Sequence, residues 1–234
     1  MNPPIFLKII LSLLATGLCL QAQSALETST NQSAHVRLNL IAPDVFQLGA
    51  VRLDKAKKTI QFPATINMTN GLIEYFLVTG TGKLHESILK AEVSAVQIHT
   101  AMLLLGAGEA ESDASKTNIS GDEITIELSW KDASGEKRVR AEDLIFNGQT
   151  KSSMNKGVWI YNGSKVIDGT FIAQRDGSLV SIIGDPLALA NSSQPSRDND
   201  EIWSVNTNAV PALNTPVEVS FKLDRPRKST QGTK

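Results

Sequence analysis

The chain has 234 residues, of which 23 are basic and 24 acidic, and its formal net charge is −1. No basic stripe stands out along the sequence, which excludes the electrostatic footprint of a nucleic-acid-binding protein. The one cysteine, Cys19, lies in an apolar N-terminal segment, so disulfides, thiolate metal sites and iron–sulfur clusters are excluded from the chain that follows.

The N-terminal segment has the order of a secretory signal peptide. Lys8 precedes an apolar run over residues 9–20, and small and polar residues follow it. The run is about twelve residues, whereas a membrane span needs roughly twenty. We therefore predict a signal peptide over residues 1–25, cleaved between Ala22 and Ala25, and export to the periplasm or the medium.

Two alternatives would keep the chain at the membrane. One is an uncleaved anchor, and the other is lipid attachment at Cys19. The bulky Leu18 immediately before the cysteine fits lipoprotein processing badly, so the sequence argues against lipidation. After signal cleavage we expect no stable membrane span.

One domain follows the signal peptide. Ser, Thr, Asn and Gln dominate residues 26–40, which predicts a flexible leader. β-like segments then follow one another without an internal repeat, and we assign them to a single domain over residues 41–223. Residues 224–234 are rich in Arg, Lys, Ser and Thr, which predicts a disordered basic tail.

Most of the predicted domain consists of short runs rich in Val, Ile, Phe and Thr, which indicates strands. Apolar and polar residues alternate most clearly in EITIELSWKD, residues 123–132. One face of this strand carries Ile124, Ile126 and Leu128, and the other carries Thr125, Glu127 and Ser129. The DASGE that follows is typical of a hairpin turn into KRVRAEDLIF.

One segment, residues 92–106, departs from this pattern because it is long and rich in helix formers. Its apolar residues cover two adjacent sides, one with Val93, Val96, Thr100 and Leu103, the other with Ile98, Met102 and Leu105. We predict a helix that is buried on most sides and ends at Gly106. The predicted fold class is therefore α+β, a mostly antiparallel sheet with one main helix, and the alternative is an all-β sandwich with a helical insertion.

Polar residues gather in the segment 72–89, which we interpret as two antiparallel strands joined by a turn at residues 79–82. With a four-residue loop, Glu74 faces Ser87, lies diagonal to His85 and shares a face with Lys83. With a three- or five-residue loop Glu74 faces Glu86, and two carboxylates at that distance repel. The first register is favoured, and in it His85 and Glu86 point to opposite faces.

The candidate site therefore consists of Glu74, Lys83, His85, Glu86 and Ser87. As a functional site it would be a polar binding site, or an acid–base pair in which Glu74 assists His85. As a structural element it would be a hydrogen-bonded network that bonds Glu74 to Lys83 or Ser87, and we favour this interpretation. The three histidines have no zinc-site spacing, so we assign no metal, cofactor or catalytic residue.

The stretches FPATINMTNGLIEYFLVTGTGKLHESIL and IHTAMLLLGAG resemble the YdjY domain of exported bacterial proteins. The resemblance continues through VWIYNGS, DGSLVSIIGDPLALAN and NTPVEV. The positions that carry it are Phe62, Pro63, Ala64, Gly71, Glu74, Tyr75, Gly82, Lys83, His85, Glu86, Ser87, Leu104, Leu105 and Gly106. Family members have been labelled ferredoxin-like, but the missing cysteines argue against an iron–sulfur cluster. The resemblance implies no assigned reaction.

The export signal and the incomplete catalytic constellation predict a non-enzymatic binding or interaction module of the bacterial envelope. Its partner would be an unknown ligand or another envelope protein. The alternative is a hydrolase or a metal-dependent enzyme that uses the Glu, His and Ser side chains of the 72–89 hairpin.

Overall fold

A sheet that closes on itself forms the centre of the molecule. The structure is a computed structural model and describes residues 37–108 and 119–225. The predicted signal peptide, most of the leader and nearly all of the tail lie outside these residues. The first strand, β1 (Leu38–Ala42), begins inside the range that we expected to be the leader.

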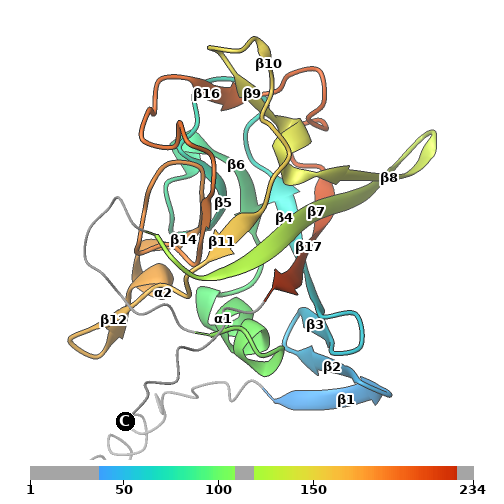
Figure 1. The fold of residues 1–234 in the computed structure, drawn as a ribbon. Coiled ribbons are helices and arrows are strands. Elements are labelled where there is room, and N and C mark those ends of the chain that lie inside the picture. Colours follow the sequence, from blue (N-terminus) through green and yellow to red (C-terminus); the bar gives the residue numbers. More distant parts are fainter. Residues whose placement is uncertain (1–36, 109–118, 226–234) are drawn as a thin grey trace, which may run out of the picture. The chain divides into compact units, whose positions relative to one another are not determined.

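Eight strands pair edge to edge into a closed barrel, most of which can be followed in Figure 1. In spatial order they are β4 (Thr59–Ile66), β17 (Pro216–Arg225), β7 (Asp122–Asp132), β11 (Trp159–Tyr161), β15 (Ala190–Ser192), β14 (Ser178–Ser181), β5 (Tyr75–Thr79) and β6 (Ser87–Ala91). β4 closes the ring because it pairs with β17 along one edge and with β6 along the other. The pairs β5–β6 and β14–β15 are parallel, and the other pairs of the ring are antiparallel.

β4 also carries an extension of the sheet, because its two halves have different neighbours. Its first half pairs with β3 (Val51–Asp54), where Arg52 lies opposite Gln61, and its second half pairs with β6. β2 (Val45–Leu48) and β1 then continue the sheet outward from β3. β8 (Gly135–Arg140) pairs with β7 and with no other described strand of this sheet.

Shorter elements complete the described structure. Two small sheets join β10 (Ser152–Ser153), β9 (Ile145–Asn147) and β16 (Trp203–Val205), and β12 (Val166–Ile167) with β13 (Thr170–Phe171). The helices are α1 (Ala95–Leu104) and α2 (Ile172–Asp176), with single 3₁₀ turns at η1 (Leu84–Glu86) and η2 (Ala141–Leu144).

The alternation of apolar and polar residues explains which face of each long strand lies inside the barrel. In β7 the predicted inner residues Ile124, Ile126 and Leu128 are buried, and the residues between them are partly exposed, so this prediction is confirmed. The same period of two holds in β4 and β17, where Phe62 and Phe221 meet edge to face with ring centroids 5.2 Å apart.

The helix predicted over residues 92–106 is shorter than expected and is buried on one side only. Ser94 and Gln97 form a capping box at its start, and the positive φ of Gly106 belongs to the turn that ends it. Ile98 and Met102 are buried, whereas the other predicted apolar side is largely open, as Val96 is 46% exposed.

The predicted α+β class is therefore wrong, and so is the sandwich alternative. The strands form one closed sheet instead of an open sheet under a helix or two stacked sheets, and α1 packs against β3 and β4 as a minor element. Strand alternation reports which residues face the core, but it is the same in an open sheet, a sandwich and a barrel. Closure depends on pairings such as β4–β17, whose members lie at opposite ends of the domain sequence.

Candidate functional site

The segment predicted as an antiparallel hairpin forms a parallel pair. Tyr75 lies opposite Ser87 and Leu77 opposite Leu89, so β5 and β6 run in the same direction. The chain returns from the end of β5 to its start through residues 80–86. This return packs tightly, because a Cβ on Gly82 would lie 2.9 Å from the carbonyl oxygen of Gly177.

Lys83 lies on this return and contacts two carboxylates. Its Nζ is 3.0 Å from Oε2 of Glu74 and 2.8 Å from Oε1 of Glu86. It also lies over the ring of Tyr75, 5.2 Å from the centroid. Partial burial lowers the pKa of Lys83, but its bonds to Glu86 and Glu74 outweigh this and hold the pKa above its usual range.

The two carboxylates stand just before two neighbouring parallel strands. Glu74 precedes β5 and Glu86 precedes β6, and the backbone N–H of Glu74 donates to the Glu86 carbonyl at 3.0 Å. We call Glu74, Lys83 and Glu86 the Lys83 cluster. Its geometry ties the starts of β5 and β6 to the chain segment that joins the strands.

The other two predicted site residues do not join Glu74. The His85 side chain is 79% exposed, and its Nε2 lies 3.6 Å from Oε2 of Glu86. Ser87 is fully buried, and its hydroxyl donates to the Lys83 carbonyl at 2.5 Å. The predicted pairing of His85 with Glu74 is therefore wrong, as is the placement of His85 and Glu86 on opposite faces. Residues 84–86 form the 3₁₀ turn η1, to which strand alternation does not apply.

A buried network that the sequence reasoning missed extends from β5. The Tyr75 hydroxyl donates to Oδ2 of Asp185 at 3.0 Å, and the Asp185 N–H donates to the side-chain oxygen of Asn191 at 2.8 Å. Asn191 donates in turn to Oδ1 of Asn162 at 2.8 Å. Burial, followed by the Asp185 charge, raises the pKa of Tyr75. The partners of Tyr75 in this network lie in the YNGS and GDPLALAN stretches, whose asparagines and aspartate were the available signal.

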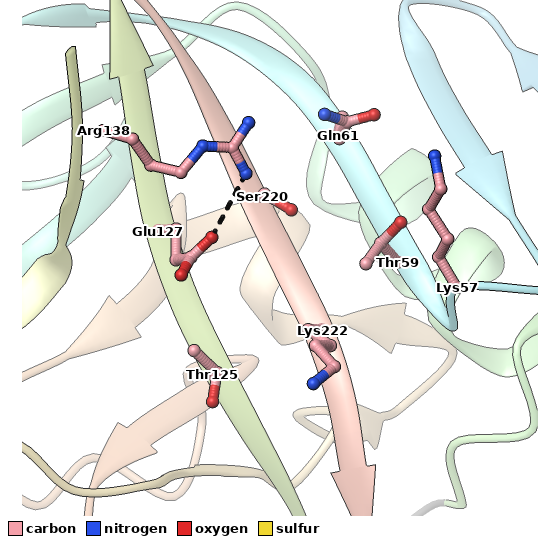
Figure 2. A pocket seen from close by; sticks show the side chains of 8 residues that line it. All are labelled: Lys57, Thr59, Gln61, Thr125, Glu127, Arg138, Ser220 and Lys222. Carbon is pink, nitrogen blue, oxygen red and sulfur yellow. Dashed lines mark hydrogen bonds and ion pairs between the residues drawn. The ribbon is translucent and has the colours of Figure 1, made fainter.

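A polar pocket lies on the outer face of the barrel, over β4, β17 and β7, and we call it the outer pocket (Figure 2). Its volume is about 420 Å³. It is lined by Lys57, Thr59, Gln61, Thr125, Glu127, Arg138, Ser220 and Lys222. Because the inward positions of these strands are apolar, the residues between them place short hydroxyl and amide groups on the outer face.

The pairing of the strands sets these side chains in two rows. Thr59, Lys222 and Thr125 are direct neighbours across β4, β17 and β7. Gln61, Ser220 and Glu127 form the next row. Figure 2 shows Arg138 of β8 and Lys57 of the β3–β4 turn on opposite sides of these rows.

The lining of the outer pocket contains more cations than carboxylates, and each cation contacts one carboxylate at 3.4 Å. Three of the lining residues are cations, and Glu127 is a carboxylate. Arg138 contacts Glu127 through one nitrogen at 3.4 Å, and Lys222 lies 3.4 Å from Asp224. Both cationic side chains are more than half exposed, at 57% and 58%. Their remaining N–H groups can therefore bind an acceptor of a ligand.

Asp54 fixes the turn that brings Lys57 to the pocket. Its Oδ1 accepts from the backbone N–H of Lys57 at 2.9 Å, and its Oδ2 lies 3.4 Å from the Lys57 Nζ. The backbone bond is the main cause that holds the pKa of Asp54 below its ordinary value of 3.8.

A second hollow of about 450 Å³ adjoins the outer pocket, and the two share Gln61. Gln61 donates to Oε1 of Glu218 at 2.8 Å, and Arg52 lies on the neighbouring strand. Polar groups thus continue along the outer surface of β4 and β17.

The sequence predicted the polar strand face that forms one side of the outer pocket, but it did not indicate that this face belongs to a binding site. It assigned Thr125, Glu127 and Ser129 to the polar face of a strand, and the first two line the pocket. Comparable faces in KTIQ and VSFK were the signal for β4 and β17, but only the strand order shows that the three faces adjoin.

Two properties of the described residues and three comparisons with known proteins complete the description of the site. In the described residues no three His, Cys, Asp or Glu side chains gather as metal ligands would. No helix of residues 37–108 or 119–225 is long and apolar enough to cross a membrane. Comparison with curated proteins and with solved structures found no match. The family model of the YdjY domain matches residues 51–222, which include the Lys83 cluster and the whole outer pocket, and the chain therefore belongs to the YdjY domain family.

Proposed function

We propose that this protein is an exported, non-enzymatic binding module of the bacterial envelope that holds a small polar ligand with an anionic group in the outer pocket. The observation that carries the proposal is the lining of that pocket, where hydroxyl and amide groups surround Lys222 on the central strand, and Arg138 and Lys57 stand on the two sides. Pockets of this size accommodate small molecules, and a few well-placed polar groups fix the ligand's orientation.

The chemistry of the lining indicates the class of ligand. Thr59 and Ser220 can donate or accept hydrogen bonds, and Thr125, whose hydroxyl donates to Asp224, can accept one, which suits a ligand rich in hydroxyl groups. Arg138 and Lys222 can each bind a carboxylate or phosphate oxygen with the donors that their present ion pairs leave free. Sugar acids combine hydroxyl groups with one carboxylate and are suitable probes.

The geometry of residues 72–89 does not support the enzymatic alternative. The Ser87 hydroxyl is fully buried and donates to a backbone carbonyl, and His85 is largely exposed and lies within ion-pair distance of Glu86. A nucleophile and its base need to lie within hydrogen-bond distance of each other. The proposed binding site is therefore the outer pocket and not the segment of residues 72–89.

The test is an NMR titration of the exported protein with galacturonate and, in parallel, with uncharged galactose. Galacturonate should shift the backbone amide resonances of Thr59, Thr125 and Ser220. It should bind roughly 10-fold more tightly than galactose, because one charge-assisted hydrogen bond contributes about that factor to the affinity. Changing both Arg138 and Lys222 to Gln should remove this difference. If these amides do not shift, or if the difference survives the double substitution, the proposed pocket is wrong.

Export is a separate part of the proposal and has its own measurement. The N-terminal sequence of protein recovered from the periplasm or the medium should begin between residues 23 and 26. Protein that stays in the cytoplasm with Met1 intact would contradict export without affecting the binding test.

A further inference from the structure

Three segments that are distant in the sequence meet at one end of the outer sheet. The β3–β4 turn lies beside the β1–β2 turn, where the Lys55 N–H donates to the Asp44 carbonyl at 2.9 Å. On its other side the same turn contacts the last residues of β17, where the Leu223 N–H donates to the Lys58 carbonyl at 2.9 Å. The two turns and the end of β17 therefore form one continuous rim.

This rim is basic. Lys55, Lys57, Lys58 and Lys222 are all exposed. Asp54 and Asp224 lie within ion-pair distance of Lys57 and Lys222. Among the residues that the structure describes, no carboxylate lies within that distance of Lys55 or Lys58, and the exposed Asp44 is the nearby acid on the adjoining turn.

Exposed apolar residues stand next to these cations. Leu40 is 66% exposed and Ile41 is 53% exposed, both on the edge strand β1. Leu40 lies opposite Phe46, and Phe46 lies opposite Leu53, which is fully buried. The apolar row thus starts in the core and continues without a break to the solvent-exposed edge.

A direct contact joins the basic and the apolar parts of the rim. The Lys55 Nζ lies 5.1 Å from the centroid of the Phe46 ring, whose cross-strand neighbour is Leu40. A soluble polyanion would use the lysines but would leave the exposed leucine and isoleucine in water. An anionic lipid surface uses both, since headgroups bind the lysines and the interface takes up the aliphatic side chains.

We infer that this rim, formed by Leu40, Ile41, Lys55 and Lys58, docks the protein on an anionic lipid surface. Each lysine near such a surface contributes about 1 kcal/mol, and each aliphatic side chain adds a hydrophobic contribution as it leaves water. Docking of this kind is reversible and depends on salt. Leu40, Ile41, Lys55 and Lys58 lie outside the outer pocket, whereas Lys57 and Lys222 of the rim line it, so the test below changes only the first four residues.

Vesicle sedimentation of the exported protein tests the inference. The protein should bind vesicles that contain phosphatidylglycerol and should leave vesicles of phosphatidylcholine alone unbound. Changing Lys55 and Lys58 to Gln should weaken binding to the anionic vesicles roughly 25-fold, which corresponds to about 2 kcal/mol. Changing Leu40 and Ile41 to Ser should weaken it roughly 10-fold.

The matched control changes Lys131 and Lys137 to Gln. These lysines flank the hairpin turn of β7 and β8, which lies at the opposite end of β7 from Asp122. The control variant removes the same charge from the protein as the Lys55–Lys58 variant does. Equal vesicle binding by this control and the Lys55–Lys58 variant would overturn the inference, as would the absence of binding to anionic vesicles.

The same edge strand could instead pair with a second copy of the chain, and one measurement separates this case. Sedimentation velocity without lipid should show a monomer for the wild type and for the Leu40–Ile41 variant. A wild-type dimer that dissociates in this variant would show that β1 is a contact between subunits and would overturn the lipid assignment.

Discussion

The Lys83 cluster and the outer pocket contain the same kinds of side chain but use them in different ways. Lys83 contacts two carboxylates at 2.8 and 3.0 Å, and both belong to residues that stand just before neighbouring strands. Arg138 contacts one carboxylate at 3.4 Å and keeps most of its donors free. Charge in the first region holds chain segments together, whereas charge in the second is available to a ligand.

The difference follows from where each region lies in the sheet. The Lys83 cluster stands where two parallel strands start side by side and where the returning chain has to be fixed. The outer pocket stands on a face whose strands are already held by long antiparallel pairings and by an apolar inner side. Substitutions should therefore change stability in the first region and ligand binding in the second.

The largest loss of stability should come from Asn191, which continues the buried network that starts at Tyr75. Asn191→Leu should lower the free energy of unfolding by about 2–4 kcal/mol, because it leaves the Asp185 N–H and the side-chain oxygen of Asn162 without their partners. Urea unfolding measures the loss. The exposed Asn155→Leu is the control and should change the free energy by less than about 0.5 kcal/mol.

Tyr75→Phe should cost less, since it removes one hydrogen bond and keeps the buried ring. We expect a loss of about 1–2 kcal/mol in urea unfolding, because Oδ2 of Asp185 loses its donor at 3.0 Å. A Tyr75→Phe protein as stable as the wild type would mean that water replaces the hydroxyl and that the network is not continuous through Tyr75.

Lys83→Met should lower the free energy of unfolding by about 1 kcal/mol, as Glu74 and Glu86 then face each other without a cation. The Lys83 side chain is 49% exposed, so the loss should decrease at high salt. His85→Gln is the neighbouring control and should leave the unfolding curve unchanged, because His85 is 79% exposed. A larger loss for His85→Gln than for Lys83→Met would contradict the geometry of the cluster.

Acid should weaken the turn that carries Lys57, and the loss of stability should be smaller than for the three substitutions above. The pKa of Asp54 is lowered in the folded protein, so its contribution to stability is complete above 3.8 and is lost as the pH falls through the folded-state pKa. The Asp54→Asn protein should therefore lose less stability than the wild type as the pH falls below about 4. Unfolding measured across this range by circular dichroism would show parallel curves if Asp54 had no such role.

Particular residues show how far the sequence could predict this structure. The inner positions of β7 and the hairpin turn into β8 follow from alternation and from turn residues, and both are confirmed. The direction of β6 could not be predicted, because Thr79–Gly–Thr–Gly82 reads as a hairpin turn. In the structure this segment packs against Gly177, about a hundred residues later, and the chain returns to run parallel to β5.

The site was predictable only in part for the same reason. Residues 72–89 attract attention because Lys, His, Glu and Ser stand next to one another in sequence, and the contact of Lys83 with Glu74 is present. The outer pocket draws its residues from four separate segments of the chain, none of which is unusual alone. Its recognition requires the order β4–β17–β7, which long-range pairing sets.

The most direct test measures binding and stability on the same two variants. The double substitution of Arg138 and Lys222 to Gln should weaken galacturonate binding at least 10-fold and change the free energy of unfolding by less than about 0.5 kcal/mol. Lys83→Met should lower the free energy of unfolding and bind galacturonate as the wild type does. The opposite result, in which Lys83→Met loses binding and the double variant loses only stability, would contradict the assignment of function to the outer pocket.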